Sequence, residues 1–408
     1  MKIIFLTISN IDNLNSSGIY TDLMRCFQKN GHNIYVVCPT ERRYKKPTQL
    51  VLDNGVNILK VRIGNIQKCN IIEKGISTLL IKRCYTKAIN KYFNDVQFDL
   101  VLYSTPPITF SNVIKYIKKR DTAKSYLLLK DIFPQNAVDL NMFSSKSVIY
   151  RYFRRKETEL YNISDKIGCM SQANVDYILK HNPEITLDKI HVNPNSIEVR
   201  DIAYSEEDKQ EIRMKYGLPI DKIIFVYGGN LGKPQGIPYI IDCLKSQRDN
   251  DKVFFLIVGS GTEYGKLESY LNEEHPNNVK LMSYISKEDY DILIASCDIG
   301  LIFLDYRFTI PNFPSRLLGY MQAGIPVLAC TDPNTDIGKV IVGGGFGWWC
   351  ESNDVDGFVS IVHKISDENI VQPIRYNAIR YLKSEYSVSF TVGKILNWDF
   401  DGGFDYEL

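Results

Sequence analysis

Short apolar runs recur along the whole chain, and each is followed by a polar loop and then by apolar residues at helical spacing. In the first half these runs are KIIFLTIS (2–9), HNIYVVCP (32–39), FDLVLYST (98–105), SYLLLKD (125–131) and DKIGCMS (165–171). The second half continues with KIIFVYGG (222–229), VFFLIVGS (253–260), NVKLMSY (278–284), DIGLIFLD (298–305), PVLACTD (326–332) and GWWCES (347–352). Strands that are apolar on both faces and alternate with helices are typical of parallel sheets covered on two sides. The pattern therefore predicts an α/β protein with two doubly wound, Rossmann-like domains.

The chain is too long for one ordinary hydrophobic core, since it has 408 residues. A polar stretch at 198–219 reads as a linker, so we expect an N-terminal domain at 1–198 and a C-terminal domain at 199–381. The tail at 382–408 carries helical signals without a new strand, and we expect it to pack back on the first domain.

The N-terminal apolar run is shorter than a signal-peptide core and reads as the first strand. No window approaches the roughly 18 apolar residues that span a bilayer. The nine cysteines form no C-x-x-C pair, and most lie in apolar runs, as do Cys38, Cys169, Cys297 and Cys330. This usage predicts buried free thiols in a reducing compartment, and hence a cytoplasmic protein.

Charge divides unevenly between the two halves. Residues 1–200 hold 30 Lys and Arg against 17 Asp and Glu, whereas residues 201–408 hold 19 against 30. In the first half the basic residues alternate with apolar ones in three clusters, at 74–93, 113–124 and 146–156. A solvated helix face explains any one cluster, but three together favour an anionic partner, such as a membrane surface. Nucleic acid is a weaker interpretation, because no known binding module is visible.

Loops after the expected strands hold the candidate chemistry. The segment IFVYGGNLGKPQG (224–236) passes from a strand through glycines towards a helix, which favours a phosphate cradle, although glycine at such turns also serves geometry alone. Gly259 marks a second glycine turn, and Gly18 precedes an amphipathic helix. Asp131 follows a strand, where a carboxylate serves either a site or a helix cap, and Pro134 favours an extended chain there.

The stretch RFTIPNFPSRLLGYMQAGIPVLA (307–329) is the most informative. Asn312, Phe313 and Ser315 are expected to open a short helix, with Pro314 in its first turn and a stop at Gly324. Arg316 would then face an arriving anion together with the helix dipole. Because Lys233 and Arg316 come from different loops of one domain, we predict that they converge on a diphosphate.

Six ordered segments carry a specific likeness: GHNIYVVCP, KDIFPQNAVDL, YGGNLGKPQGIPYII, FLIVGSGTEYGKLE, VKLMSYISKEDYDILIASCDIGLIFL and FPSRLLGYMQAGIPVLA. Together they resemble the retaining glycosyltransferases of family 4, in the branch that builds bacterial O-antigens and capsules. The resemblance covers nearly the whole chain. It implies a GT-B fold, in which the N-terminal domain binds the acceptor and the C-terminal domain binds a nucleotide-sugar.

The resemblance also implies roles for single residues. The loop with Gly229, Asn230, Gly232 and Lys233 would lie against the donor diphosphate. Tyr284 and Ile285 match the place where the nucleobase is held. The donor sugar and phosphates would meet Asn312, Phe313 and Ser315, while Gly18 would lie in the loop that closes over the donor and Asp131 beside the reacting centre.

One departure from the family concerns its two glutamates, whose positions are occupied here by Pro311 and Gly319. The first is often missing in this branch. The second usually grips the ribose hydroxyls, and its loss is worth about 1.5 to 3 kcal/mol of donor binding unless another group takes over.

The expected reaction moves a sugar from a UDP-sugar or other nucleotide-sugar to a lipid-linked saccharide, without metal or cofactor. Lys233 and Arg316 would stabilise the leaving diphosphate, and a donor phosphate oxygen or Asp131 would take the acceptor proton. His32 is expected to be structural. The predicted location is the inner face of the cytoplasmic membrane. Two alternatives stay open: a non-catalytic GT-B partner subunit, favoured by Gly319, and a GT-B nucleotide-sugar epimerase.

Overall fold

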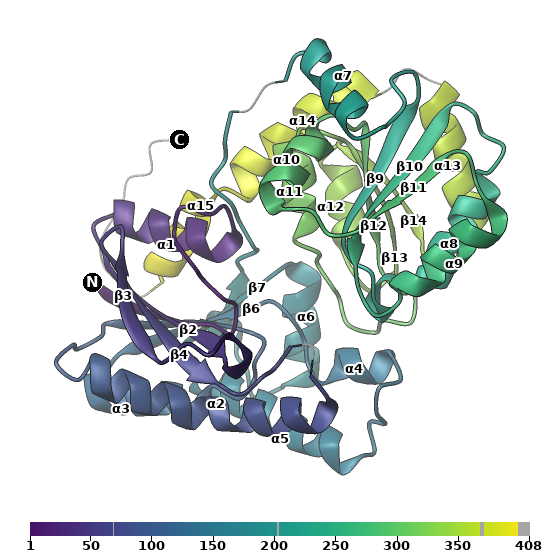
Figure 1. Ribbon diagram of the computed structural model, residues 1–408. Helices are drawn as coiled ribbons and strands as arrows, with labels where there is room; N and C mark the ends of the chain where they lie inside the picture. Colours follow the sequence, from purple (N-terminus) through teal and green to yellow (C-terminus); the bar gives the residue numbers. More distant parts are fainter. Residues whose placement is uncertain (68, 202–203, 368–370, 399–408) are drawn as a thin grey trace. The chain divides into compact units, whose positions relative to one another are not determined.

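The computed structural model of the protein describes residues 1–67, 69–201, 204–367 and 371–398, and the chain divides into two compact units (Figure 1). The first unit joins Met1–Glu198 to the segment that begins at Val388, and the second is Val199–Ser387. Each contains one sheet, and every predicted apolar run overlaps a strand of one of these sheets. The predicted fold class, two parallel-sheet α/β domains, is confirmed.

The sheet of the first unit has the strand order β3-β4-β2-β1-β5-β6-β7-β8, and only β3 and β4 are antiparallel. Its central strands are almost wholly buried, as expected for strands covered on both faces. The strands are β1 (Lys2–Leu6), β2 (Asn33–Glu41), β3 (Gln49–Asp53), β4 (Val56–Ile63), β5 (Leu100–Ser104), β6 (Lys124–Leu129), β7 (Lys166–Cys169) and β8 (Ile190–Val192).

Helices cover both faces of this sheet. On one face α1 and α15 pack together over Ile3 and Phe5 of β1. On the other, α2 packs on β4, α3 packs on β5 and β6, and α3 lies between α2 and α5 (Figure 1). The helices of this unit are α1 (Ile19–Lys29), α2 (Ile71–Tyr92), α3 (Ser111–Asp121), α4 (Gln135–Asp139), α5 (Val148–Ile163), α6 (Gln172–His181) and α15 (Val388–Leu396), with short 3-10 turns η1 (Arg42–Tyr44) and η2 (Leu187–Lys189).

The C-terminal tail begins later than the sequence suggests. Helix α14 (Val371–Glu385) runs past residue 382 and packs on α11 (Arg316–Gln322) of the second unit, where Leu382 is buried. The chain joins the first unit at Val388, whose N–H donates to the Ile197 carbonyl. Helix α15 then packs on α1, because Val392 and Ile395 belong to the first unit's core. Residues 382–387 therefore lie in the second unit and not in the first.

The second unit has a fully parallel sheet with the order β11-β10-β9-β12-β13-β14. Its strands are β9 (Ile223–Asn230), β10 (Val253–Ser260), β11 (Val279–Met282), β12 (Ile299–Phe303), β13 (Val327–Thr331) and β14 (Gly347–Glu351). Its other helices are α7 (Glu206–Lys215), α8 (Ile237–Ser246), α9 (Tyr264–Glu274), α10 (Lys287–Ala295), α12 (Ile337–Gly343) and α13 (Val355–Asp367), with a 3-10 turn η3 (Lys233–Gln235). Because all six strands are parallel, the loops that follow them lie along one edge of the sheet.

All nine cysteines are free thiols, and Cys38, Cys169, Cys297 and Cys330 are buried as predicted. Burial raises the pKa of the Cys38 thiol to about 11 and that of Cys297 to about 12, so both stay protonated at neutral pH. Across the described parts of the chain, no helix combines the length and the hydropathy that a membrane span requires.

Candidate functional site

The glycine loop, residues 228–236 at the end of β9, is held against the neighbouring strand β10 by backbone contact. A Cβ built on Gly259 would lie 1.9 Å from the Gly229 carbonyl oxygen, and one on Gly261 would lie 2.2 Å from that of Leu231. Gly229 has φ +134°, a conformation that favours glycine. Glycine is therefore required here for the close approach of two chain segments, whatever ligand the loop holds.

A buried glutamine closes this loop. Gln235 Oε1 accepts hydrogen bonds from Asn230 Nδ2 (3.0 Å) and from the Gly232 N–H (3.1 Å), and the Leu231 N–H donates to the Ser260 carbonyl. The Asn230 side chain and the Gly232 amide are thus already paired within the loop. Lys233 begins η3 with an exposed side chain, and within the described residues it makes no ion pair. The loop therefore presents a lysine amine from a fixed backbone.

Arg316 lies close to Gly229 of the same loop. A Cβ on Gly229 would be 3.4 Å from Arg316 Nη2, and the Arg316 guanidinium carbon lies 4.4 Å from the centre of the Tyr227 ring. Arg316 Nη1 is buried without a hydrogen-bond partner among the described residues. A guanidinium with a buried, unpaired N–H is poised to bind an anion.

Tyr290 of α10 completes this cluster. A Cβ on Gly228 would fall 1.8 Å from the Tyr290 hydroxyl, so the phenol covers the Gly228 backbone directly. Burial, followed by the nearby Tyr320 hydroxyl, raises the pKa of Tyr290 well above its usual value. The Tyr290 hydroxyl oxygen is buried and has no hydrogen-bond partner among the described residues. The phenol is therefore a neutral donor beside Arg316.

Two more buried polar groups come from the loop before α11 and from the residue after β13. The Asn312 carbonyl accepts a hydrogen bond from Thr335 Oγ1 (2.5 Å), while Asn312 Nδ2 is buried with no partner among the residues described. Asp332, which follows β13, is buried and accepts from the N–H groups of Asn334 and Thr335 at 2.9 and 3.2 Å. Burial raises its pKa to about 6.

The helix itself begins later than predicted. It starts at Arg316 with Ser315 as its N-cap, so Asn312, Phe313 and Pro314 lie in the preceding loop and Pro314 is not in the first turn. The exposed Ser315 side chain makes no cap hydrogen bond. Phe313 instead packs on Tyr386, with ring centres 6.2 Å apart, and this contact fixes the loop against the end of α14. The predicted stop is confirmed, because α11 ends at Gln322 and Gly324 has φ +64°.

Tyr284 and Ile285 follow β11 on the same edge of the sheet. Tyr284 is 75% exposed, whereas Ile285 is partly buried. Gly319 lies inside α11, and a Cβ there would meet only Ile294 Cδ1, at 3.7 Å. Position 319 thus has room for a side chain that the sequence does not supply.

In the first unit the Gly18 turn is fixed by an internal carboxylate. The Gly18 N–H donates to Asp22 Oδ1 (3.1 Å), and the Glu198 N–H donates to Asp22 Oδ2 (2.9 Å). Arg25 pairs with Asp22 and also donates to the Ser16 carbonyl (3.0 Å). The Asp22 carboxylate therefore occupies the place at the start of α1 where an anion would otherwise bind.

Asp131 lies just beyond β6, in a partly buried position. Its Oδ1 accepts from Asn136 Nδ2 (2.8 Å), and its backbone N–H donates to Thr105 Oγ1 (3.2 Å). Burial raises the pKa of Asp131 to about 6, against the lowering effect of Asn136. The neighbouring Lys130 has a pKa lowered by burial to about 7. The peptide bond between Phe133 and Pro134 is cis, and α4 begins directly after it.

Sequence reasoning missed four of these groups: Tyr290, Gln235, Asp332 and Lys130. Gln235 stood in the quoted glycine loop, and Lys130 and Asp332 stood at strand ends, so each carried a weak signal. Tyr290 is one of 26 tyrosines and lies in a helix, so nothing in the sequence distinguished it.

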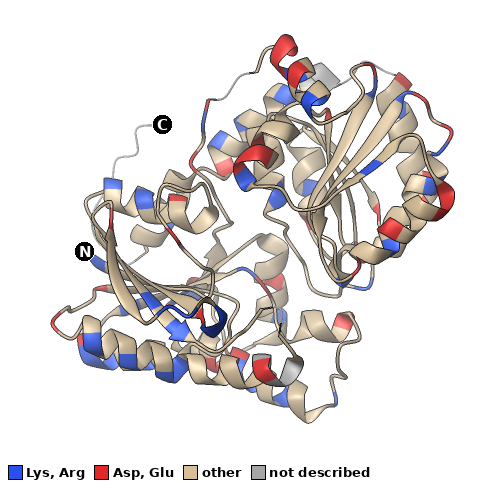
Figure 2. Cartoon of the chain, viewed as in Figure 1, with Lys and Arg blue, Asp and Glu red and all other residues tan. Residues whose placement is uncertain are grey.

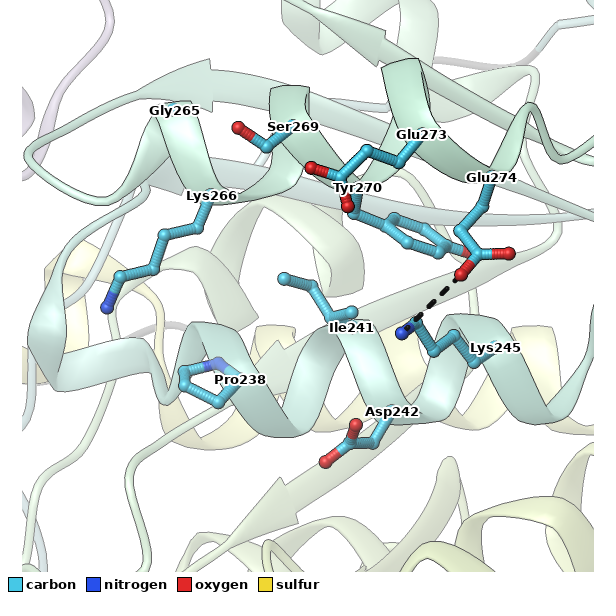
Figure 3. A pocket seen from close by; sticks show the side chains of 10 residues that line it. All are labelled: Pro238, Ile241, Asp242, Lys245, Gly265, Lys266, Ser269, Tyr270, Glu273 and Glu274. Carbon is cyan, nitrogen blue, oxygen red and sulfur yellow. Dashed lines mark ion pairs between the residues drawn. The ribbon is translucent and has the colours of Figure 1, made fainter.

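A separate surface hollow of about 530 Å³ lies between α8 and α9 (Figure 3). Lys245 Nζ lies 3.9 Å from Glu274 Oε1 in it and also faces the Tyr270 ring. None of the predicted site residues lines this hollow.

Residues 208–382 match the family described as glycosyl transferases group 1. Among curated proteins, the probable glycosyltransferase WbjE of Pseudomonas aeruginosa is 21% identical over 356 residues, which are 87% of each chain. An Escherichia coli UDP-Gal:alpha-D-GlcNAc-diphosphoundecaprenol alpha-1,3-galactosyltransferase is 21% identical and spans 57% of this chain and 56% of its own. Among solved structures, Anabaena HepE in complex with UDP superposes with a TM-score of 0.70 at 16% identity, over 97% of this chain and 98% of its own.

The two parallel-sheet units give the chain a GT-B fold, and the family match and the curated relatives indicate a glycosyltransferase. The family match lies within the second unit, and the chain is similar over most of its length to a glycosyltransferase of the type found in bacterial polysaccharide biosynthesis. The family 4 resemblance is consistent with these matches.

Proposed function

We propose that the protein is a retaining transferase that moves a sugar from a UDP-sugar to a saccharide carried on a lipid diphosphate, during synthesis of a bacterial surface polysaccharide such as an O-antigen or capsule. The glycosyltransferase class supports the reaction type. The names of two similar proteins support the proposed donor and acceptor. HepE was crystallised with UDP, and the E. coli relative acts on a diphosphoundecaprenol-linked sugar.

The observation that carries the proposal is the Arg316 guanidinium beside the backbone of Gly229, whose buried Nη1 has no hydrogen-bond partner among the described residues. As the anomeric C–O bond breaks, the electron pair leaves with the UDP phosphate oxygen, and negative charge grows there. Arg316, Lys233 and the Tyr290 phenol would stabilise this charge more in the transition state than in the ground state, which lowers the barrier.

The acceptor hydroxyl oxygen forms the new bond to the anomeric carbon, and its proton passes to a base. Two groups compete for this role in our proposal, a phosphate oxygen of the donor and Asp131. The pKa of Asp131, about 6, makes it an ionised but moderately basic carboxylate at neutral pH.

The remaining predicted residues would shape the donor site. The exposed ring of Tyr284 offers a face for a uracil, next to Ile285. Asn312 Nδ2, buried without a partner in the described chain, would donate to the sugar or the diphosphate. We propose that transfer needs neither a divalent metal nor a cofactor, because the two cations supply the positive charge; activity that survives EDTA would support this, and activity that requires added Mg²⁺ would contradict it.

Calorimetry with UDP, GDP and a panel of UDP-sugars tests the donor assignment. We expect UDP to bind and Arg316→Gln to weaken binding, whereas the surface control Arg248→Gln should bind as the wild type does. Transfer of labelled sugar to a lipid diphosphate acceptor, with the anomeric configuration read by NMR, then tests the reaction. An inverted linkage would contradict retention, and the absence of nucleotide binding would contradict the proposal as a whole.

A further inference from the structure

Two of the three basic clusters of the first unit lie on outer helices of one layer. Helices α2 and α5 lie on either side of α3, on the face of the sheet opposite α1 and α15 (Figure 1). Figure 2 shows Lys and Arg positions, in blue, along the helices of this layer. Clusters separated by tens of residues in the sequence thus belong to one surface.

The central helix contributes little free charge to this surface. Lys115 pairs with Glu159 (2.7 Å), Lys118 with Asp165 (2.7 Å), and Arg120 with the adjacent Asp121. These contacts neutralise three of the cations at 113–124 within the unit. Lys119 of this helix stays exposed, so most, but not all, of the free positive charge belongs to the two flanking helices.

The segment that leads into α5 exposes large apolar side chains next to unpaired cations. Met142, Val148, Ile149 and Tyr152 are 65%, 76%, 55% and 41% exposed. Around them, Lys146, Arg151 and Arg155 are exposed, and within the described chain none forms an ion pair. Residues 142–156 contain no Asp or Glu. We name this surface, residues 142–155, the α5 patch.

Helix α2 repeats the arrangement. Ile76, Leu79 and Leu80 are 56%, 44% and 43% exposed, and one turn further on the exposed side chains become basic. These exposed cations are Arg83, Lys87 and Lys91, which form no ion pair among the described residues. Spacings of three and four residues place both sets along one stripe of the helix, which we name the α2 stripe. The stretch at 74–93 contains no acidic residue.

We propose that the α5 patch and the α2 stripe dock on an anionic lipid bilayer. Exposed aliphatic side chains gain by entering the boundary between headgroups and acyl chains, and cations beside them gain from the negative surface potential. Nucleic acid would match the cations but not the aliphatic side chains, since its recognition uses phosphate contacts and base stacking. The proposal rests on the proposed function only for the location of the acceptor.

Co-sedimentation with phosphatidylglycerol-containing vesicles tests whether the docking face, formed by the α5 patch and the α2 stripe, binds an anionic bilayer. Phosphatidylcholine vesicles serve as the reference. The charge variant is Lys146→Gln with Arg151→Gln and Arg155→Gln, and the apolar variant is Val148→Ser with Ile149→Ser. The control removes the same charge at exposed positions near the β3–β4 hairpin, with Lys45→Gln, Lys46→Gln and Arg62→Gln. Circular dichroism melting verifies that each variant is folded.

We expect the wild type to bind only the anionic vesicles and to be released by salt. Because each cation near an anionic surface is worth about fivefold in affinity, the charge variant should lose about 100-fold, and much more than its control. The apolar variant should also bind more weakly, without a change in salt dependence. Equal losses in the charge variant and its control, or no loss in the apolar variant, would overturn the proposal, as would tighter binding to RNA or to an acidic protein than to the vesicles.

A transfer assay with a short-chain, water-soluble acceptor separates this proposal from the proposed function. Folded docking variants should turn over that acceptor at the wild-type rate and fail only with a long-chain acceptor in vesicles. A wild type that binds vesicles but transfers to neither acceptor would contradict the proposed function and leave the docking face supported. A wild type that transfers to the short-chain acceptor but binds no vesicle would overturn the docking face alone.

Discussion

The Arg316 guanidinium stacks on the ring of Tyr227, with 4.4 Å between its central carbon and the ring centre. The tyrosine belongs to β9 and the arginine to α11, so the contact joins the end of a strand to the start of a helix beside Gly229. The aromatic face holds the cation in position without neutralising it, because it offers no formal negative charge. A cation held in this way remains available to an anion.

Replacing Arg316 by Gln should lower kcat/KM for transfer by about 10² to 10³, the loss typical of one preorganised group at a developing anion. The loss should fall mainly on kcat. Steady-state kinetics against the Arg248→Gln control measures it. An unchanged kcat with a raised KM would mean that Arg316 binds the ground state and the transition state equally.

Lys233→Ala should reduce turnover strongly while the melting temperature stays within about 2 °C of the wild type, because an exposed side chain without an ion pair supports no core. Kinetics and calorimetric melting measure the two quantities. If the variant transfers sugar at the wild-type rate, Lys233 has no role in the reaction. An early unfolding transition would instead give it a structural role.

Asp131 should impose a pH dependence on both rate and stability. If it is the base, kcat/KM should rise as pH passes the carboxylate pKa, about 6, and Asp131→Asn should lose this rising limb. If Asp131→Asn keeps both the wild-type rate and the rise of kcat/KM with pH, the donor phosphate takes the proton instead.

The stability effect of Asp131 has the opposite sign. Folding raises its pKa, so the folded state binds the proton more tightly and stability falls as pH rises from about 4 to about 6. Asp131→Asn should therefore be more stable than the wild type at pH 7, by about 1 to 3 kcal/mol. Denaturant unfolding at pH 4 and pH 7 measures it, and the difference should vanish at pH 4. A variant less stable than the wild type at pH 7 would contradict the burial argument.

Gly259→Ala should disturb the glycine loop. The added methyl would lie 1.9 Å from the Gly229 carbonyl oxygen, so β9 and β10 must separate at their ends, at a cost of about 1 to 3 kcal/mol and with loss of UDP affinity. Gly319→Ala is the matched control, because the same change there meets only Ile294 at 3.7 Å. It should stabilise α11 by about 0.5 to 1 kcal/mol. Equal effects of the two substitutions in urea unfolding would refute this account of the glycine loop.

Gly319→Glu tests whether the carboxylate missing from the family pattern limits donor binding. The space beside Ile294 admits the start of the side chain, and a regained charge-assisted hydrogen bond should tighten UDP binding about 10- to 150-fold. Calorimetry with UDP, compared with deoxy-UDP, measures the gain and its dependence on the ribose. A gain that is equal for both nucleotides would exclude a ribose contact, and no gain would mean that another group already serves this role.

Part of the fold could be predicted from the sequence because it depends on patterns among neighbouring residues. The apolar runs placed the strands of both central sheets, and helix-boundary rules placed the start of α1 after Gly18 and the end of α11 before Gly324. The β3–β4 hairpin was missed although Asn54 and Gly55, both with positive φ, mark it as a tight turn. Strand β8 has only three residues, too few to show a pattern.

The sequence by itself determined the fold class, the glycine loop and the excess of positive charge in the first half, since apolar period, chain-bending residues and net charge are properties of neighbouring residues. Only the tertiary structure decided that Tyr290 covers Gly228 and that Gln235 accepts hydrogen bonds from the polar groups of the glycine loop. It also decided that three cations of α3 form ion pairs within the first unit. Those facts depend on which side chains meet across elements far apart in the chain. Packing and ion pairing act through distance in space, which a linear pattern does not record.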